Sequence, residues 1–96
     1  VEDVLNRLGS VDAAYVIGDY ARGIDSGLID VVLVGTVESE TLENFVLKTG
    51  NLIDRKIRPL VLNLEEFEKL RMRLDIDHAL PIWNKAKDSI SQRLLT

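Results

Sequence analysis

The sequence predicts an α/β (α+β) fold, a small mixed sheet of three to four strands with helices packed on it. Two short apolar segments, 13–17 and 29–34, are rich in small and β-branched residues, which is typical of buried strands. Before and after them, apolar residues recur every three or four positions, the period of an amphipathic helix. This order of elements in 96 residues predicts a single domain that covers residues 1–96.

The first third of the chain is expected to contain a helix, a strand, a turn and a second strand. Residues 1–8 have helical apolar spacing, and Gly9 is expected to end that helix. Residues 18–27 hold three glycines and are expected to form a turn, or a short helix entered by a tight turn. The run Val31–Val34 is apolar at every position, so both faces of its strand are expected to be covered.

The middle of the chain predicts a long helix followed by a third strand. Residues 39–53 place their apolar side chains on one helical stripe, and acidic residues lie early, where the helix dipole favours them. Gly50 is expected either to end this helix or to kink it. Residues 57–62 predict a strand, in which Pro59 favours an edge position or an early place in the strand.

The last third has the best local helix signal. Asn63 is a good N-cap, and Glu66 three residues later completes a capping-box pair, so a helix is expected from there to about Arg73. Residues 80–83 are expected to form a short strand or an irregular segment. Residues 85–95 predict a final helix with its apolar positions four residues apart.

Composition narrows the class of protein. A net charge of −4 lacks the basic field on which non-specific nucleic-acid binding depends, so we expect no direct contact with nucleic acid. No apolar run approaches the roughly 20 residues that cross a bilayer, so no membrane span is expected. The absence of cysteine fits a reducing, cytoplasmic location. The chain starts at Val1 without Met, which suggests a fragment or a processed chain.

The chemistry-bearing residues lie in the stretch 17–35. It predicts a buried strand, a glycine-bounded turn, and a second buried strand with one carboxylate, Asp30, near its start. This layout suits a site where backbone amides hold a phosphate and an acidic strand holds a metal ion. The candidate nucleotide- or phosphate-binding residues are Gly18, Asp19, Tyr20, Arg22 and Gly23, and the candidate metal ligand is Asp30.

These residues resemble the signature of the polymerase-beta-like nucleotidyltransferase superfamily in its minimal form. In that pattern, Gly-Ser and a small or aromatic residue precede Ala-Arg-Gly, and Ser-Asp-x-Asp then leads into an apolar strand. The matching positions are Gly18, Tyr20, Ala21, Arg22, Gly23, Asp30 and the strand residues 31–35. The chain is most similar to the small domains of this family that are fused to winged-helix transcriptional regulators in prokaryotes. The resemblance therefore implies a fused or partner DNA-binding domain.

The resemblance also implies metal chemistry for which this chain has an incomplete ligand set. The family holds two divalent ions with two carboxylates one residue apart on a strand and a third from a later strand. Here Leu28 stands at the first position, and the third strand has no acid, with Arg58 near the expected place. Only Asp30 remains. Asp19 replaces the family's serine, and an ionised carboxylate repels a phosphate.

Three functions are compatible with this pattern. The leading expectation is a degenerate, non-catalytic domain that acts as a regulatory or interaction module of a transcriptional regulator, with no catalytic residue beyond a relict Asp30 and no cofactor. The alternative is an active minimal nucleotidyltransferase that uses Mg²⁺ to transfer a nucleoside monophosphate from NTP to a protein or a small molecule. The third is a homodimerisation domain in which the last helix and Trp83 form the contact between two copies. The other interpretation of Trp83 is that it is a core residue.

Several charged side chains allow two interpretations. Arg22 holds a phosphate or pairs with an acid such as Asp19 or Asp30, and Asp30 is a lone metal ligand or a partner of Arg22 that caps turn amides. Movement of Asp19 or Asp25 toward Asp30 would rebuild a single metal site. The segment 75–78, which has two carboxylates beside the only histidine, is expected to be a solvated loop after a helix rather than a metal site.

Overall fold

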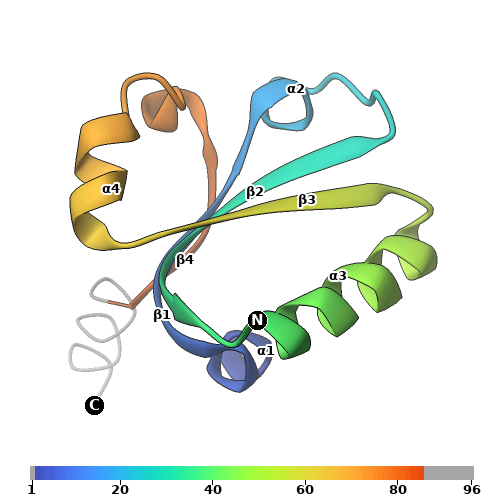
Figure 1. The fold of residues 1–96 in the computed structure, drawn as a ribbon. Coiled ribbons are helices and arrows are strands. Elements are labelled where there is room, and N and C mark those ends of the chain that lie inside the picture. The colour runs from blue at the N-terminus through green and yellow to red at the C-terminus, as the bar shows by residue number, and fades with distance from the viewer. Residues whose placement is uncertain (1, 86–96) are drawn as a thin grey trace, which may run out of the picture.

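Four strands form one mixed sheet in the order β3–β2–β1–β4, with β1 antiparallel to both β2 and β4 and with β3 parallel to β2 (Figure 1). The strands are β1 (Gly9–Ile17), β2 (Leu28–Val37), β3 (Lys56–Leu62) and β4 (Leu80–Asn84). This computed structural model describes residues 2–85, with the side chains of residues 2–4 excepted. The predicted mixed sheet with packed helices is confirmed.

The helices lie on both faces of the sheet. They are α1 (Glu2–Leu8), α2 (Gly18–Ala21), α3 (Ser39–Ile53), α4 (Leu64–Leu70) and the 3-10 helix η1 (Ile76–His78). We call the face that packs against α1 and α3 the back face, and the face that packs against α4 and η1 the front face (Figure 1). Among the residues that the structure describes, no helix is both long and apolar enough to cross a bilayer.

Strand β2 is the centre of both cores. Its side chains alternate, so that Val32 and Val34, at 0% and 1% exposure, face the front cluster, and Leu33, at 4%, faces the back cluster. On the front face Val32 packs in one cluster with Leu62 and with Phe67 of α4. The expectation that this strand is covered on both faces is therefore confirmed.

Trp83 of β4 belongs to the back-face core. It is partly buried against the cluster that contains Leu8 and Ala14, and its indole Nε1 donates a hydrogen bond to the carbonyl of Val11 at 3.2 Å. A buried indole needs such a partner. The core interpretation of Trp83 is thus the one that the structure supports, and the final helix predicted at 85–95 lies, beyond residue 85, outside the described residues.

Local signals explain most element boundaries. Gly9 ends α1 as predicted and also begins β1 with φ of 143°, where a Cβ would collide with the carbonyl of Thr36. The Asn63 side chain accepts from the amide of Glu66 at 2.8 Å, and the Glu66 carboxylate accepts from the amide of Asn63 at 3.0 Å, which confirms the capping box. Helix α4 ends at Leu70, earlier than predicted, and the chain continues in turns.

Helix α3 runs through Gly50 rather than ending there. A Cβ at residue 50 would meet the carbonyl of Arg55 at 2.7 Å, so glycine is required by the close return of the chain into β3. The helix ends at Ile53, where Asp54 takes the left-handed conformation with φ of 54°. Of the two alternatives expected for Gly50, the helix end is therefore wrong, because α3 continues for three residues to Ile53.

Both outer strands of the sheet contain a proline. Pro59 lies in β3 and Pro81 in β4, the two edges of the sheet, so the predicted edge position of Pro59 is confirmed. A proline has no amide to donate, so it weakens an exposed edge as a template for another strand. The sheet edges are thus poor surfaces for strand-to-strand association.

Candidate functional site

The glycine turn lies at the end of β1, directly beside Asp30 of β2. Gly18 has φ of 72°, which allows β1 to turn at once into α2. A Cβ on Gly18 would lie 3.3 Å from Oδ2 of Asp30, so the carboxylate packs closely against the turn. The structure therefore brings together the turn and the strand carboxylate that the sequence motif singled out.

Asp30 forms a bidentate ion pair with Arg58 of the neighbouring strand. The parallel register of β2 and β3 places these two residues side by side. Nε of Arg58 donates to Oδ1 of Asp30 at 2.7 Å, and Nη2 donates to Oδ2 at 2.9 Å. This paired geometry matches a planar guanidinium to a carboxylate, and the bond to Asp30 raises the pKa of Arg58. Both oxygens of the one expected metal ligand are thus engaged by a cation.

This partner of Asp30 corrects one expectation. The sequence suggested that a structural Asp30 pairs with Arg22, but the structure gives it Arg58. The reason is geometric, because Arg58 is adjacent in the sheet, whereas Arg22 follows α2 and lies by Asp19 and Asp75, with nitrogen–oxygen distances of 3.5 and 4.0 Å. Arg22 does pair with Asp19, which was the other acid considered for it.

The remaining turn residues are open to solvent. Tyr20 is 40% exposed, and Gly23 has φ of 83°, a conformation that favours glycine with or without a ligand. The side chains of Asp19 and Arg22 are each more than half exposed. The turn residues are therefore polar and exposed to solvent. Their contacts do not decide whether they bind a phosphate.

The residues around Asp30 do not fit a divalent metal ion. Leu28, two positions earlier on the same face of β2, offers no oxygen, and Arg58 brings a positive charge to the third expected ligand position. Magnesium selects several hard oxygen ligands. Across residues 2–85, no group of three His, Cys, Asp or Glu side chains is placed to hold a metal ion. An ion pair between Asp30 and Arg58 therefore stands where the resemblance implied metal ligands.

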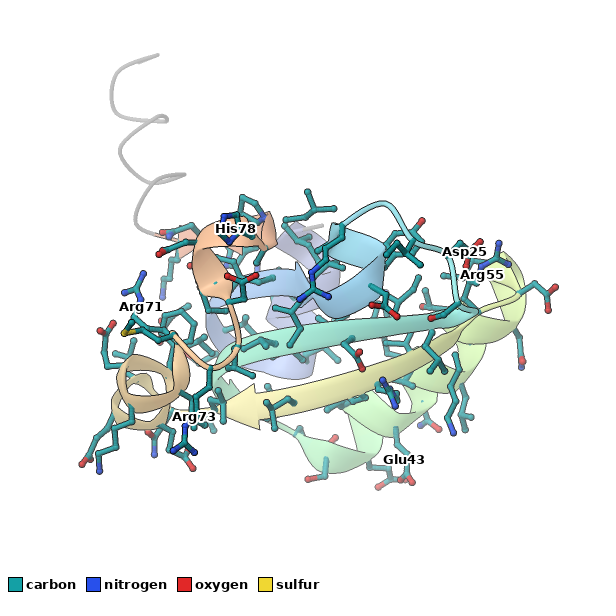
Figure 2. The ribbon with its side chains drawn as sticks, turned by 90° about the horizontal axis from the view of Figure 1, so that it is seen from above. Asp25, Glu43, Arg55, Arg71, Arg73 and His78 are labelled. Carbon is teal, nitrogen blue, oxygen red and sulfur yellow. The ribbon has the colours of Figure 1, made fainter. Side chains whose placement is uncertain are left out.

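Asp25 does not complete the site, because it is bound elsewhere. Its Oδ1 accepts from Nε of Arg55 at 2.9 Å and from the amide of Gly27 at 3.0 Å. The bond from Arg55 is the main reason that the pKa of Asp25 is lowered from its ordinary value of 3.8. In Figure 2 this pair lies at the end of the sheet, where it joins the loop before β2 to the turn between α3 and β3. The proposed movement of Asp19 or Asp25 toward Asp30 is thus not what the structure shows.

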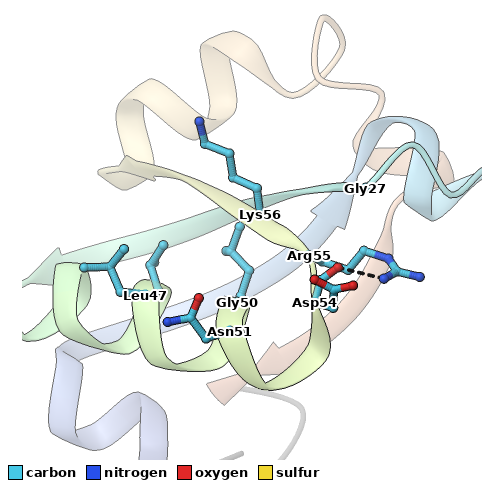
Figure 3. Close-up of a pocket in the computed structure, with 9 residues that line it drawn as sticks. Gly27, Leu47, Gly50, Asn51, Asp54, Arg55 and Lys56 are labelled. Carbon is cyan, nitrogen blue, oxygen red and sulfur yellow. Dashed lines mark hydrogen bonds between the residues drawn. The ribbon is translucent and has the colours of Figure 1, made fainter.

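Arg55 also borders a shallow hollow between α3 and the start of β3. The hollow has a volume of about 480 Å³ and includes Gly27, Gly50 and Lys56 in its wall (Figure 3). Arg55 itself donates to the carbonyl of Asp54 at 2.7 Å as well as to Asp25, so its guanidinium is committed to fastening this turn. We interpret Arg55 as a structural clamp and not as a ligand-binding group.

The segment around the only histidine was expected to be a solvated loop, but residues Ile76–His78 form the 3-10 helix η1, and Ile76 is buried in the front core. Nδ1 of His78 lies 2.7 Å from Oδ1 of Asp75, and the His78 side chain is 78% exposed. The hydrogen bond with Asp75 raises the pKa of His78. Arg22 reaches the other oxygen of Asp75 at 4.0 Å, so the loop lies next to the glycine turn. Sequence reasoning missed this contact, because nothing in the local pattern connects residues 53 positions apart.

The sheet order, the glycine turn between two antiparallel strands and the following helices agree with the fold that the sequence resemblance implied. Solved structures similar to this chain have the same fold. They include a toxin–antitoxin complex, MntA–HpeT, in a variant with two aspartates replaced by glutamate, at TM-score 0.62 and 13% identity over 97% of this chain and 84% of that chain.

Two further similar structures are also toxin–antitoxin complexes. One contains AMP-PNP and aligns at TM-score 0.61 and 15% identity over 97% of this chain and 85% of that one. The other is a complex of a tri-AMPylated HEPN toxin from Shewanella oneidensis with the MNT antitoxin, at TM-score 0.56 and 13% identity over 98% and 79% of the two chains. The sequence matches no protein-family model and no curated protein. At this identity the likeness establishes the fold alone.

Proposed function

We propose that this chain is a nucleotidyltransferase-fold domain that has lost metal-dependent transfer and serves as a regulatory or interaction module for a protein partner. The observation that carries the proposal is the bidentate Asp30–Arg58 pair. The guanidinium of Arg58 is hydrogen-bonded to both oxygens of the carboxylate that, by the resemblance, would bind the metal ions. The fold is retained, whereas the charge that catalysis requires has been reversed at one ligand position.

Elementary electrostatics shows why this substitution matters. A divalent ion 4 Å from a guanidinium is repelled by about 2 kcal/mol in water, and by several-fold more in the less polar surroundings of a protein surface. To bind at Asp30, the ion would also have to break the two hydrogen bonds from Arg58. Leu28 has no oxygen atom in its side chain that could replace the lost ligand. Arg58 therefore both competes for Asp30 and repels a metal ion at this position.

A protein partner is supported by the structural neighbours, which are complexes of two proteins. The more specific expectation, that the partner or a fused segment is a DNA-binding regulator of the cytoplasm, comes from the sequence resemblance. It agrees with the net charge of −4, because an acidic domain leaves DNA contact to another segment. We therefore assign DNA binding to the partner and regulation to this domain.

A transfer assay tests the proposal. The protein is incubated with each of the four labelled nucleoside triphosphates, with Mg²⁺ or Mn²⁺, and with candidate protein and small-molecule acceptors. We expect no metal-dependent label in any acceptor. Transfer that requires metal and disappears in Asp30→Ala would refute the proposal.

A measurement of nucleotide binding tests the proposal without the need to choose an acceptor. A nucleotide–metal complex present at 100 times its dissociation constant stabilises a fold by about 2.7 kcal/mol, a clear shift in melting temperature for a domain of this size. We expect ATP and Mg²⁺ to leave the melting temperature of the protein unchanged. A saturable rise in melting temperature would count against the loss of nucleotide binding in its usual form.

The alternative, an active minimal nucleotidyltransferase, is favoured by one observation. A structure of the same fold contains AMP-PNP, and another contains an AMPylated toxin beside its MNT antitoxin. If this chain follows them, Mg²⁺ serves as its cofactor and the acceptor is its protein partner. The same two measurements decide, because an active enzyme must both bind the nucleotide and transfer label.

A further inference from the structure

The carboxylate of Asp75 lies between two basic side chains that come from different parts of the chain. Its Oδ1 is 2.7 Å from Nδ1 of His78 in the same short segment, and its Oδ2 is 4.0 Å from Nη2 of Arg22, which follows α2. Nη1 of Arg22 is in turn 3.5 Å from Oδ1 of Asp19. Acids and bases thus alternate in a row, Asp19–Arg22–Asp75–His78, that joins the glycine turn to η1.

The backbone fixes the place of the Asp75 carboxylate. Asp75 is the N-cap of η1 and has the left-handed conformation with φ of 54°. Its amide donates to the carbonyl of Met72 at 3.2 Å, and its carbonyl accepts from the amide of His78 at 3.0 Å. The next residue, Ile76, is buried in the front core. The carboxylate therefore belongs to a segment that is anchored to the core, whereas His78, at 78% exposure, reaches it from solvent (Figure 2).

The protonation state of His78 sets the charge that Asp75 offers to Arg22. Histidine is the side chain that ordinarily changes charge near neutral pH, where aspartate stays ionised. With a neutral imidazole, the Asp75–His78 pair carries one negative charge, which attracts a guanidinium. With an imidazolium, the pair is neutral as a whole, and the imidazolium repels the guanidinium. Arg22 then keeps Asp19 as its one ionic partner.

The groups packed around His78 agree with a change of charge near neutral pH. The hydrogen bond with Asp75 is the main reason that the pKa of His78 is raised above its ordinary value of 6.5. Strand β1, which packs against η1, adds Tyr15 and Ile17 to the core below it. The charged side chains around the segment are Asp75 and Asp77 within it, Arg22 beside α2, and Arg71 at the end of α4, which pairs with Glu68 at 3.4 Å.

We propose that the Asp75–His78 pair is a pH-sensitive clip that holds the glycine turn to η1 through Arg22. When His78 is neutral, Arg22 is held between Asp75 and Asp19. When His78 is protonated, the clip releases Arg22 to Asp19 alone. The turn is exposed, so this change of partner alters the charge that the domain presents there. The clip acts on the turn whether or not nucleotidyl transfer has been lost.

The other end of the same loop provides an internal control. Asp25 is bound by Nε of Arg55 at 2.9 Å, and its Oδ1 also accepts from the amide of Gly27 at 3.0 Å. This pair lowers the pKa of Asp25 and raises that of Arg55, so both groups stay charged over the range in which His78 titrates. The proposal therefore predicts a response to pH at Arg22 and Gly23 but not at Gly27.

An NMR titration of the ¹⁵N-labelled full chain from about pH 5 to about pH 9 tests the proposal. The chain has one histidine, so the imidazole signals give the midpoint of His78 directly. We expect the side-chain Nε signal of Arg22 and the amide signals of Arg22 and Gly23 to shift with that midpoint, while the amide of Gly27 does not. In His78→Gln the shift of these Arg22 and Gly23 signals should be lost.

Substitutions of the two partners test the coupling from the side of the histidine. Arg22→Gln removes a cation that repels the imidazolium and should raise the measured pKa of His78. Asp75→Asn should lower this pKa and abolish the response of Arg22, and asparagine also tolerates the left-handed conformation. Lys69→Gln is the matched control, because it removes a positive charge from another exposed ion pair, with Glu65 at 3.3 Å, and should leave the midpoint unchanged.

Three results would overturn the proposal. The first is an Arg22 signal that does not follow the midpoint of His78, or that follows it equally in His78→Gln. The second is an equal shift at Gly27, which would indicate a change of the whole loop. The third is a midpoint that Arg22→Gln leaves unchanged, as Lys69→Gln should. If a variant does not fold, the titration of the wild-type protein decides through the contrast between Arg22 and Gly27.

Discussion

The front face of β2 has two halves that share one strand and one direction but differ in what holds them. In one half, Val32 and Val34 are fully buried under the helix α4 that follows β3. In the other half, the Asp30 side chain is 31% exposed and is held by Arg58. The first half depends on packed volume and the second on a single ion pair. Residues of the second half can therefore change the chemistry of the site with little effect on the fold.

The largest expected effect is on the packed half. Leu62→Ala removes a side chain that is 4% exposed, and a buried leucine truncated in this way destabilises a protein by about 2–5 kcal/mol. Leu60→Ala, on the same face of β3 but 40% exposed, is the control and should change stability by less than about 1 kcal/mol. Urea denaturation of both variants measures the difference. Equal losses would contradict the division into two halves.

The next largest effect is expected from two substitutions that would turn the surroundings of Asp30 into a metal site. Leu28→Asp combined with Arg58→Asp surrounds Asp30 with oxygen ligands and removes the competing cation. Without metal this variant should melt below the wild type, because like charges repel. With Mn²⁺ at 100 times its dissociation constant, it should gain about 2.7 kcal/mol. Arg58→Gln alone is the control and should gain nothing. If Mn²⁺ does not stabilise the double variant, Leu28 and Arg58 are not the only residues that prevent metal binding at Asp30.

A smaller effect is expected from the cap of the helix that covers the packed half. Asn63→Ala removes the acceptor for the amide of Glu66 and should destabilise the protein by about 1 kcal/mol. Asn51→Ala, at an exposed position within α3, is a matched control that removes the same side chain without a cap. Thermal melting compares the two variants, and an equal effect would argue against the capping box.

The smallest effect is expected from the second arginine–aspartate pair, Asp25–Arg55, at the same end of the sheet. The bond from Arg55 lowers the pKa of Asp25 below its ordinary value of 3.8. A carboxyl with a lowered pKa in the folded protein stabilises the fold above its unfolded pKa, and this stability is lost as the pH falls through the folded pKa. Asp25→Asn should therefore lower the melting temperature at pH 6 and have a vanishing effect near pH 2. A constant difference across this range would contradict the assignment.

Much of the fold was readable from local sequence patterns. The capping residues Asn63 and Glu66, the edge proline Pro59 and the glycine turn at Gly18 each act within a few residues, so local chemistry determines them. The pairing of Asp30 with Arg58 was not readable, because it depends on the parallel register of two strands 28 residues apart. The sequence shows that residue 28 offers no oxygen and that the strand 57–62 has no acid. Only the structure shows that Arg58 pairs with Asp30.

The central claim, that Arg58 has taken the place of a metal ion at Asp30, can be tested residue by residue. Mn²⁺ is titrated into the ¹⁵N-labelled wild-type protein, and the loss of each amide signal by paramagnetic broadening is measured. We predict that the amides of Gly18 and Asp30 lose no more intensity than those of other exposed residues. Selective broadening of these two amides, abolished by Asp30→Asn, would contradict the account.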